Sequence, residues 1–317
     1  MNQRGQRWGI VLAGGSGTRL WSLTGGSGAP VPKQYCSLRG GRSLLAETIA
    51  RAARVVPRER IVVVVVEEHR PYWEREVARF PGENVLVQPC NRGTALGVLL
   101  PLLVILERDP GATILCLPSD HFVREERVLE RAFASLTAIQ SVVLLGIVPE
   151  SAETGYGWIL PGPKRSVRAF VEKPSPPVAR DLMLRGGVWS SFVLVATGRP
   201  LLELFQRRLS GPSTSVAAAL AEAPHGRGRA LEIAYAGLDP ADFSRDVLEG
   251  AEPSLRLEVV PSCGWTDLGT PERLERCLAE IARREPIETH PKTPWNGVLD
   301  LSQRIAGGSR RIHGVGV

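Results

Sequence analysis

The sequence predicts an α/β fold with a mostly parallel, doubly wound (Rossmann-like) sheet and helices on both of its faces. Apolar strand-like runs alternate with helical patterns through the first half of the chain. Strands separated by helices imply βαβ units and parallel pairing. Ile61 to Val66 is an unbroken run of six β-branched residues, which is typical of a central parallel strand covered on both faces.

The elements of the first half follow one another in a regular order. The expected strands are Trp8 to Ala13, Ile61 to Val66, Thr113 to Leu117 and Val142 to Val148, and the expected helices are Leu44 to Arg54 and Thr94 to Glu107. Pro101 falls inside the second of these helices, where a proline either kinks a helix or marks its first turn.

The second half of the chain is more mixed. The expected elements there are strands at Val167 to Val171 and Val188 to Val195, and helices at Arg199 to Arg208 and Pro271 to Arg284. Thr270 as the N-cap and Pro271 at the first position mark the start of the last helix. Gly211 to Gly228 is rich in Ala, Ser, Pro and Gly without a strong period, so we expect a loop there that flanks a short helix. The residues after Pro286 are polar, glycine-rich and irregular.

Composition limits the possible partners. The 317 residues carry a formal net charge of +6, which suits anionic ligands, but no run of five or six like charges points to a nucleic-acid arm. No apolar segment reaches the length of about 18 residues that spans a membrane, and the N-terminus lacks a signal-peptide pattern. We therefore expect a cytoplasmic protein that binds neither nucleic acid nor membrane. The five cysteines form no CxxC pair, so neither a zinc site nor a disulfide framework is indicated.

A glycine-rich segment follows the first expected strand and is the most informative part of the sequence. It is LAGGSGTRL, from Leu12 to Leu20. Its three glycines let the backbone approach a ligand closely, and their N–H groups can bind phosphate oxygens. Arg19 adds a planar guanidinium suited to phosphate. The segment has neither the ending of a P-loop nor the spacing of a dinucleotide fold, so taken alone it could be glycine-rich merely to turn.

Two aspartates lie near the ends of expected strands. Asp120 follows Ile114 to Leu117, and Asp267 follows Leu255 to Val260 after a short connection. Ligands of open α/β sheets bind beyond the carboxyl ends of the strands, so both carboxylates can lie at the same edge. Asp120 alone could equally be the N-cap of the next helix.

These segments belong to an ordered set of motifs. The set comprises LAGGSGTRL (12–20), PKQ (32–34), QPCNRGTA (88–95), LPSDH (117–121), GYG (155–157), FVEKP (170–174) and WTDLG (265–269). In this the chain, from Trp8 to Leu274, resembles the sugar-1-phosphate nucleotidyltransferase family, most closely the mannose-1-phosphate guanylyltransferases. The ordered set is far more specific than any one of its members.

The resemblance implies a Mg²⁺-dependent enzyme that joins a nucleoside triphosphate, GTP, to a sugar 1-phosphate, mannose 1-phosphate, and releases pyrophosphate. Such a reaction needs positioning, cations and a divalent metal rather than a protein nucleophile. The resemblance further implies a nucleotidyltransferase domain at residues 1–285 with a mixed α+β sugar-binding portion. The irregular composition after Pro286 indicates a short C-terminal tail at residues 286–317.

Individual roles follow from the matched motifs. Catalytic roles fall to Arg19, Lys33 and Asp120. The nucleotide-binding residues are Leu12, Ala13, Gly14, Gly15, Gly17, Thr18, Gln88, Arg92, Thr94 and Ser119. The sugar-phosphate-binding residues are Gly155, Tyr156, Glu172, Lys173 and Ser190. The metal ligands are Asp120 and Asp267.

The chain departs from the family pattern at several of these motifs. The family often has Glu at the position of Gln88 and Asn at the position of Gly93, which leaves the base contacts open. Ser190 and Phe192 stand where the family has Asn and Gly, and a serine has less reach than an asparagine toward sugar hydroxyls. The Thr24 to Val31 loop is also longer than in many relatives. The oligomeric state is left open, with a homodimer as one option.

Two other classes of function remain open from the sequence. One is a non-catalytic relative that binds a nucleotide or a sugar phosphate as a regulator, which the changes at Gly93, Ser190 and Phe192 allow. The other is a glycosyltransferase with a similar nucleotide-binding sheet. That class usually carries an Asp-x-Asp metal motif, and no such triplet occurs in this sequence.

Overall fold

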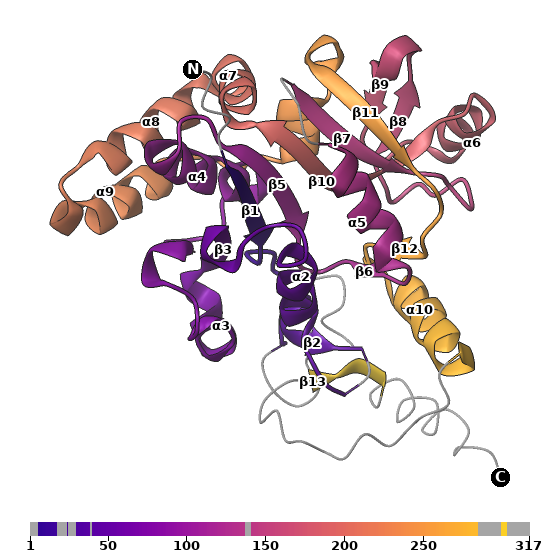
Figure 1. Cartoon of the computed structure of the whole chain (residues 1–317), viewed down its shortest axis with the longest axis horizontal. Helices are drawn as coiled ribbons and strands as arrows, with labels where there is room; N and C mark the ends of the chain where they lie inside the picture. Colours follow the sequence, from indigo (N-terminus) through magenta and orange to yellow (C-terminus); the bar gives the residue numbers. More distant parts are fainter. Residues whose placement is uncertain are drawn as a thin grey trace.

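A mixed sheet runs through the molecule with helices on both sides (Figure 1). The computed structural model describes residues 6–17, 24, 30–38, 40–136, 141–284 and 299–302, and within them the sheet has nine strands. The main path of the sheet is β11 (Leu255–Val260), β7 (Val142–Ile147), β10 (Val188–Thr197), β5 (Thr113–Pro118), β1 (Arg7–Leu12), β3 (Ile61–Val66) and β4 (Val85–Gln88). Two further strands, β8 (Trp158–Pro161) and β9 (Val167–Val171), extend it from β10.

The strand directions confirm the predicted fold class. The pairs β1·β3, β1·β5, β3·β4 and β7·β11 are parallel. Only β10 on the main path runs the other way, antiparallel to both β5 and β7. The β-branched run forms β3 between β1 and β4, and all six of its residues are buried.

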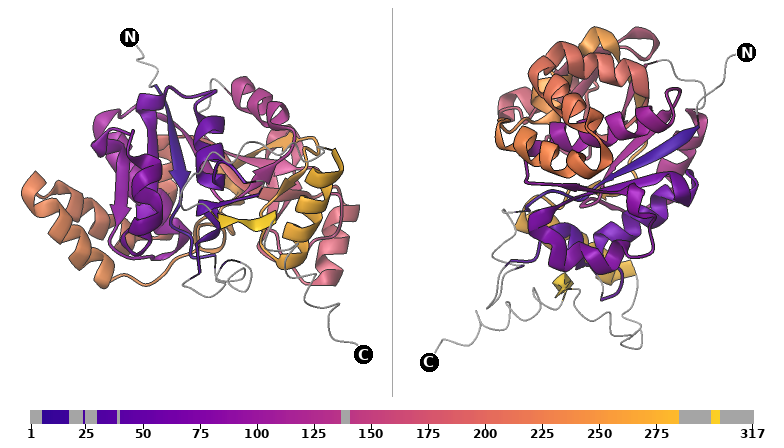
Figure 2. Two further views of the ribbon diagram at one scale, coloured as in Figure 1. Left: turned by 90° about the horizontal axis from the view of Figure 1, so that it is seen from below. Right: turned by 90° about the vertical axis from the view of Figure 1, so that its left-hand side faces the viewer.

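Helices cover both faces of this sheet, as the end-on view in Figure 2 shows. They are α2 (Leu44–Ala52), α3 (Arg70–Val77), α4 (Gly93–Arg108), α5 (Glu126–Ser135), α6 (Pro176–Leu184), α7 (Gly198–Arg208), α8 (Ser210–Ala221), α9 (Pro224–Ala236) and α10 (Pro271–Arg284). Successive side chains of a strand point to opposite faces. On β3, Val62 and Val64 accordingly pack in a core cluster with α4 and α7, whereas Val63 and Val65 pack in a second cluster with α2, α3 and α5. Pro101 lies inside α4.

The predicted loop at 211–228 was wrong, because α8 and the first turns of α9 occupy this segment. Tertiary packing outweighs the weak local signal here. Val216 and Leu220 of α8 are buried in the first core cluster, and Tyr235 near the end of α9 is 0% exposed. Pro224 stands in the first turn of α9, where a proline is compatible with a helix. The two helices form a hairpin at one side of the molecule (Figure 1).

Among the described residues, two small ladders lie outside the main sheet. β6 (Phe122–Val123) pairs antiparallel with β12 (Trp265–Thr266), and β2 (Cys36–Ser37) pairs parallel with β13 (Leu299–Asp300). The second ladder therefore attaches four described residues of the C-terminal segment to the domain, and Leu301 is buried beside Cys36 and Leu44. The remainder of 286–317 lies outside the described residues. In the described part of the chain, no helix combines the length and the apolar character that a membrane span requires.

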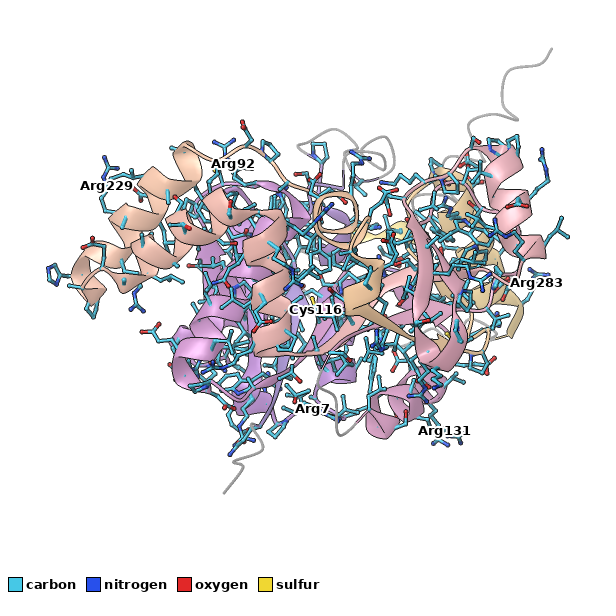
Figure 3. All side chains as sticks on the ribbon, turned by 90° about the horizontal axis from the view of Figure 1, so that it is seen from above. Arg7, Arg92, Cys116, Arg131, Arg229 and Arg283 are labelled. Atoms are coloured by element: carbon cyan, nitrogen blue, oxygen red, sulfur yellow. The ribbon has the colours of Figure 1, made fainter. Side chains whose placement is uncertain are left out.

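Figure 3 shows one residue of the interior and several of the exposed arginines. Cys116 of β5 is fully buried and lies deep in the molecule in Figure 3. The exposed residues Arg131, Arg229 and Arg283 lie at separate borders of the same view. This matches a positive charge that is dispersed along the chain.

Candidate active site

The register of the sheet brings the predicted motifs to one edge. Leu12 pairs with Pro118, and Val66 pairs with Gln88, so the segments after β1, β3, β4 and β5 leave the sheet together. Because β10 is antiparallel, its first residues reach the same edge, where Trp189 pairs with Ile147. This edge is where open α/β sheets bind their ligands.

The second aspartate reaches this edge through the β6·β12 ladder. Phe122 pairs with Thr266 in antiparallel register. The residue before Phe122 therefore lies opposite the residue after Thr266, which places His121 opposite Asp267. Figure 1 shows β6 and β12 side by side near α10.

Side-chain donors hold the carbonyl groups of the glycine-rich segment. Gln34 Nε2 donates to Ala13 O at 3.0 Å and to Gly15 O at 2.8 Å, and Asn91 Nδ2 donates to Gly14 O at 3.1 Å. In a trans peptide the carbonyl and the following N–H point in opposite directions. The bonded carbonyls therefore direct the next amide groups away from these side chains, in the manner of an anion-binding loop.

One glycine of this segment is required by its backbone and its neighbour. Gly17 has a φ of +62°, and a Cβ there would lie 3.2 Å from Lys33 N. The segment thus packs directly against the short helix η2 (Lys33–Tyr35). Thr18 and Arg19, which were assigned to the triphosphate, lie outside the described residues.

Lys33 is buried and joins the two aspartates. Its Nζ lies 3.0 Å from Asp120 Oδ2, and it also donates to Asp267 O and, at 3.4 Å, to Leu268 O. An ammonium group has three donors, and each of them has a partner here. Lys33 must therefore give up one of these partners if it is to bind a phosphate.

Asp120 sits just beyond β5 with its charge stabilised. Burial would raise the pKa of its carboxyl group, but Lys33 and the neighbouring His121 outweigh that effect and hold the pKa below its ordinary value. His121 Nε2 lies 3.7 Å from Asp120 Oδ1. Burial lowers the pKa of His121, and Asp120 raises it by less. Ser119 donates its hydroxyl to Leu12 O at 2.6 Å and ties β5 to β1.

Asp267 is held by a tight turn and by an arginine. Its Oδ1 accepts from Gly269 N at 2.7 Å and from Arg273 Nη1, also at 2.7 Å. Leu268 has a φ of +49°, and a Cβ on Gly269 would come within 2.5 Å of Asp267 Oδ2. The carboxylate is therefore fixed in place.

Arg273 was missed in the sequence. Its Nη2 donates to Glu153 Oε2 at 2.9 Å, its guanidinium carbon lies 4.2 Å from the centre of the Tyr156 ring, and only 7% of its side chain is exposed. A Cβ on Gly155 would lie 2.0 Å from its Nη2. One signal was available, because a cation in the first turn of a helix opposes the helix dipole and so needs a specific partner.

The donor set fits magnesium. In the described ranges no three or more His, Cys, Asp or Glu side chains group as a metal site. Lys33 contacts the carboxylate of Asp120 and the backbone carbonyl of Asp267, so both residues lie beside one lysine. Mg²⁺ is commonly bound by one or two carboxylates, with phosphate oxygens and waters completing its shell. Asp120 and Asp267 are the residues that would hold it, and it would offset negative charge at a phosphate.

Aromatic rings line the predicted sugar side. The Tyr156 ring lies 5.1 Å from that of Trp189 and 4.9 Å from that of Trp265, measured between ring centres. The Tyr156 hydroxyl forms a 3.3 Å hydrogen bond with Thr266 Oγ1. Tyr156 thus spans the space between the β6·β12 ladder and β10.

Glu172, Lys173 and Ser190 also meet on this side. Lys173 Nζ lies 3.3 Å from Glu172 Oε1. A Cβ on Gly157 would lie 2.6 Å from Glu172 Oε2 and 3.3 Å from Ser190 Cβ. Gly157 therefore lies against both side chains, with no room for a larger residue. Burial raises the pKa of Glu172, and Lys173 lowers it by less.

Phe192 occupies a backbone conformation that favours glycine. Its φ is +62°, at the irregularity between Ser190 and Leu194 where β10 shifts register against β7. The family's glycine at this position suits such a conformation. Here the Phe192 ring packs 5.6 Å from that of Phe243, which compensates for the strained backbone.

The segment assigned to the nucleotide is attached to α9 and the residues after it. Gln88 Oε1 accepts from the Tyr235 hydroxyl at 3.3 Å, Arg92 Nε donates to Tyr235 O at 2.7 Å, and Thr94 Oγ1 accepts from Phe243 N at 2.8 Å. Arg92 lies beside the α8–α9 hairpin in Figure 3. The guanidinium of Arg92 is thus engaged in holding the end of a helix.

The same attachment explains the glycine at position 93. Gly93 has a φ of +84°, and a Cβ there would lie 2.2 Å from Ala241 O. An asparagine tolerates positive φ but has no room beside this carbonyl. The close approach of Ala241 therefore accounts for the departure from the family pattern.

Comparisons with known proteins identify the family of the chain. A family model described as nucleotidyl transferase matches residues 8–284. The alginate biosynthesis protein AlgA of Pseudomonas aeruginosa is 30% identical over 82% of this chain and 56% of its own length. Mannose-1-phosphate guanylyltransferase 2 of Escherichia coli O157:H7 is 33% identical over 61% of this chain and 44% of its own length. The chain thus spans about half the length of these curated relatives.

A solved structure is similar over most of both chains. The crystal structure of mannose-1-phosphate geranyltransferase from Thermus thermophilus is 32% identical, with a TM-score of 0.74, and the match covers 86% of this chain and 79% of that one. Since the family model covers nearly the whole described sheet and its helices, the chain belongs to the nucleotidyl transferase family.

Proposed function

We propose that the chain is a Mg²⁺-dependent enzyme that joins GTP to mannose 1-phosphate and releases pyrophosphate. The observation that carries the proposal is the meeting of three features at one sheet edge. These are the glycine-rich segment, the Lys33–Asp120 pair and Asp267, whose backbone carbonyl accepts a hydrogen bond from Lys33. The names of the E. coli and T. thermophilus relatives, both of which act on mannose 1-phosphate, support the choice of sugar phosphate.

The site divides between the two substrates. The triphosphate lies on Gly14, Gly15 and Gly17 with Thr18 and Arg19, and the nucleoside lies near Gln88 and the segment after it. The sugar 1-phosphate lies between Tyr156, Glu172, Lys173 and Ser190. Residues 1–285 form the catalytic unit, which works in the cytoplasm with no nucleic-acid or membrane partner.

The reaction is an in-line displacement at the α-phosphorus. A phosphate oxygen of the sugar 1-phosphate forms the new bond, and the bond to the bridging oxygen of pyrophosphate breaks. The attacking phosphate is already ionised, so His121 is needed for orientation rather than as a base. Lys33 and Arg19 reduce the repulsion between the two anions, and the amide groups after Ala13 hold the triphosphate in line.

A substrate panel tests this proposal. Each nucleoside triphosphate is paired with each sugar 1-phosphate, and pyrophosphate release is followed with the Asp120→Asn variant as the inactive control. GTP with mannose 1-phosphate should give the highest kcat/KM. Another pair that is about tenfold better, a difference of about 1.4 kcal/mol in transition-state binding, would overturn the specificity and leave the reaction class standing. Nucleotide binding with no pyrophosphate release from any pair would favour a non-catalytic relative.

Sugar choice should be relaxed, because Ser190 reaches less far than the family's asparagine. One lost hydrogen bond to a sugar hydroxyl corresponds to about 0.5–1.5 kcal/mol of discrimination. Ser190→Asn should therefore raise the preference for mannose 1-phosphate over its epimers by roughly two- to tenfold in kcat/KM. An unchanged or smaller preference in competition assays would show that Ser190 does not contact the sugar.

A further inference from the structure

Arg273 occupies the position at the second carboxylate where a divalent cation would also need to bind. It makes two charged hydrogen bonds, one to Asp267 Oδ1 and one to Glu153 Oε2. An arginine guanidinium is not deprotonated in proteins. The side chain is therefore a permanent cation in direct contact with Asp267.

This contact works against binding of a metal ion. Asp267 Oδ1 already accepts both from Arg273 and from Gly269 N, so its lone pairs are used. A divalent ion at this carboxylate has to replace the arginine or to lie within a few ångströms of a like charge. Lys33 forms the corresponding ion pair with Asp120, with its Nζ 3.0 Å from Asp120 Oδ2. The protein thus carries its own cation at each of the two acidic residues.

The arginine is also held from the sugar side. Glu153 bonds its Nη2 at 2.9 Å, the Tyr156 ring lies under its guanidinium, and Gly155 leaves just enough space for it. These three contacts do not involve Asp267. They can keep Arg273 in place when its bond to Asp267 is lost, so that the carboxylate can be released without unfolding of the helix that carries the arginine.

We propose that Arg273 is the built-in counter-ion of Asp267, which suppresses binding of a free divalent cation and makes the metal bind together with the nucleoside triphosphate. The triphosphate brings several negative charges, which attract the divalent ion and so strengthen its binding beside Asp267. Arg273 is a positioning residue, because it acts through Asp267. The inference rests on the proposed function, since it takes Asp267 to be a metal ligand.

Direct binding of Mn²⁺ tests this inference without any turnover. Free Mn²⁺ is measured by its electron paramagnetic resonance signal while it is titrated against the full chain in the absence of nucleotide. Arg273→Met removes the charge and keeps the length of the side chain, and it should bind Mn²⁺ at least about tenfold more tightly than the wild type. Arg273→Lys keeps the charge and should stay within about threefold of the wild type.

A second variant covers the risk that the first is poorly folded. Arg273→Met leaves the Glu153 carboxylate without its partner. The double variant Arg273→Met, Glu153→Gln removes that unpaired charge. It should bind Mn²⁺ more tightly than the wild type by the same factor as Arg273→Met does. Equal or weaker Mn²⁺ binding in both methionine variants would overturn the inference, provided that the wild type binds Mn²⁺ in the presence of GTP. Failure of the wild type to bind Mn²⁺ even with GTP would overturn the proposed metal site itself, and the inference with it.

Discussion

The two sides of the candidate site are built by different means. On the nucleotide side, the side chains of Gln34 and Asn91 bond backbone carbonyls of the glycine-rich segment. On the sugar side, Glu172 and Arg273 instead pair with other charged side chains, and aromatic rings surround Tyr156. The first arrangement shapes a backbone to fit any triphosphate. The second depends on individual side chains and can therefore differ between relatives.

Backbone strain is also divided unequally between the two sides. Positive φ on the nucleotide side falls on glycines such as Gly17 and Gly93, whereas Lys173, Phe192 and Leu268 adopt it on the sugar side without being glycines. Such a residue costs about 1–2 kcal/mol. All three lie within two residues of Glu172, Ser190 or Asp267. The sugar side thus holds its functional groups with strained connections, which typically mark functional sites.

The two lysines test this division most strongly. Lys33→Ala removes the buried link between Asp120 and the carbonyls of Asp267 and Leu268, so kcat/KM should fall about 10²–10³-fold, and the midpoint of urea unfolding should also fall. Lys173 is 46% exposed and its partner Glu172 is 10% exposed. Lys173→Ala should raise KM for the sugar phosphate and should lower the midpoint of urea unfolding by less than Lys33→Ala does. If calorimetry shows that each variant weakens the binding of both substrates equally, the distinction between the two sides is wrong.

Gly93 tests the attachment of the nucleotide segment to the residues after α9. Gly93→Asn introduces a Cβ at a site where Ala241 O would be 2.2 Å away. Overpacking of this kind costs about 1–3 kcal/mol, so the free energy of unfolding in urea should decrease by that amount. Gly82→Asn is the matched control, because no atom lies within 4 Å of a Cβ at that position. Wild-type stability of Gly93→Asn would mean that Ala241 does not constrain this position.

Glu172 gives the smallest effect and a pH dependence with a definite sign. Its folded-state pKa is raised by burial from 4.5, so the stability that it contributes is present below pH 4.5 and is lost as the pH rises through the raised value. Glu172→Gln should therefore be more stable than the wild type at pH 7, and the difference should vanish toward pH 4. Urea unfolding at the two pH values measures it. A variant less stable than the wild type at pH 7 would show that the ion pair with Lys173 dominates instead.

The comparison of the two sides also shows which features the sequence could reveal. The strand β3 depends on six neighbouring residues and was predicted with its observed bounds. The glycine-rich segment was predicted to follow the first strand, and its described residues do follow β1. The hairpin of α8 and α9 was not, because its helices depend on burial of Val216 and Tyr235 against distant elements. Arg273 escaped notice for the same reason, since its partner Glu153 is 120 residues away in the sequence. Phe192 and Gly93 were recognised as departures, but their compensation by Phe243 and Ala241 needed the fold.

The central claim is that Asp120 and Asp267 serve one cation, and a double-mutant cycle tests it most directly. Asp120→Asn and Asp267→Asn should each lower kcat by about 10²–10⁴-fold, and the double variant should be little worse than the poorer single one, because either loss already removes the shared ion. Asp120→Asn combined with Lys173→Ala is the control, in which the two losses of kcat/KM should multiply. A double aspartate variant whose loss of kcat equals the product of the two single losses would contradict the account.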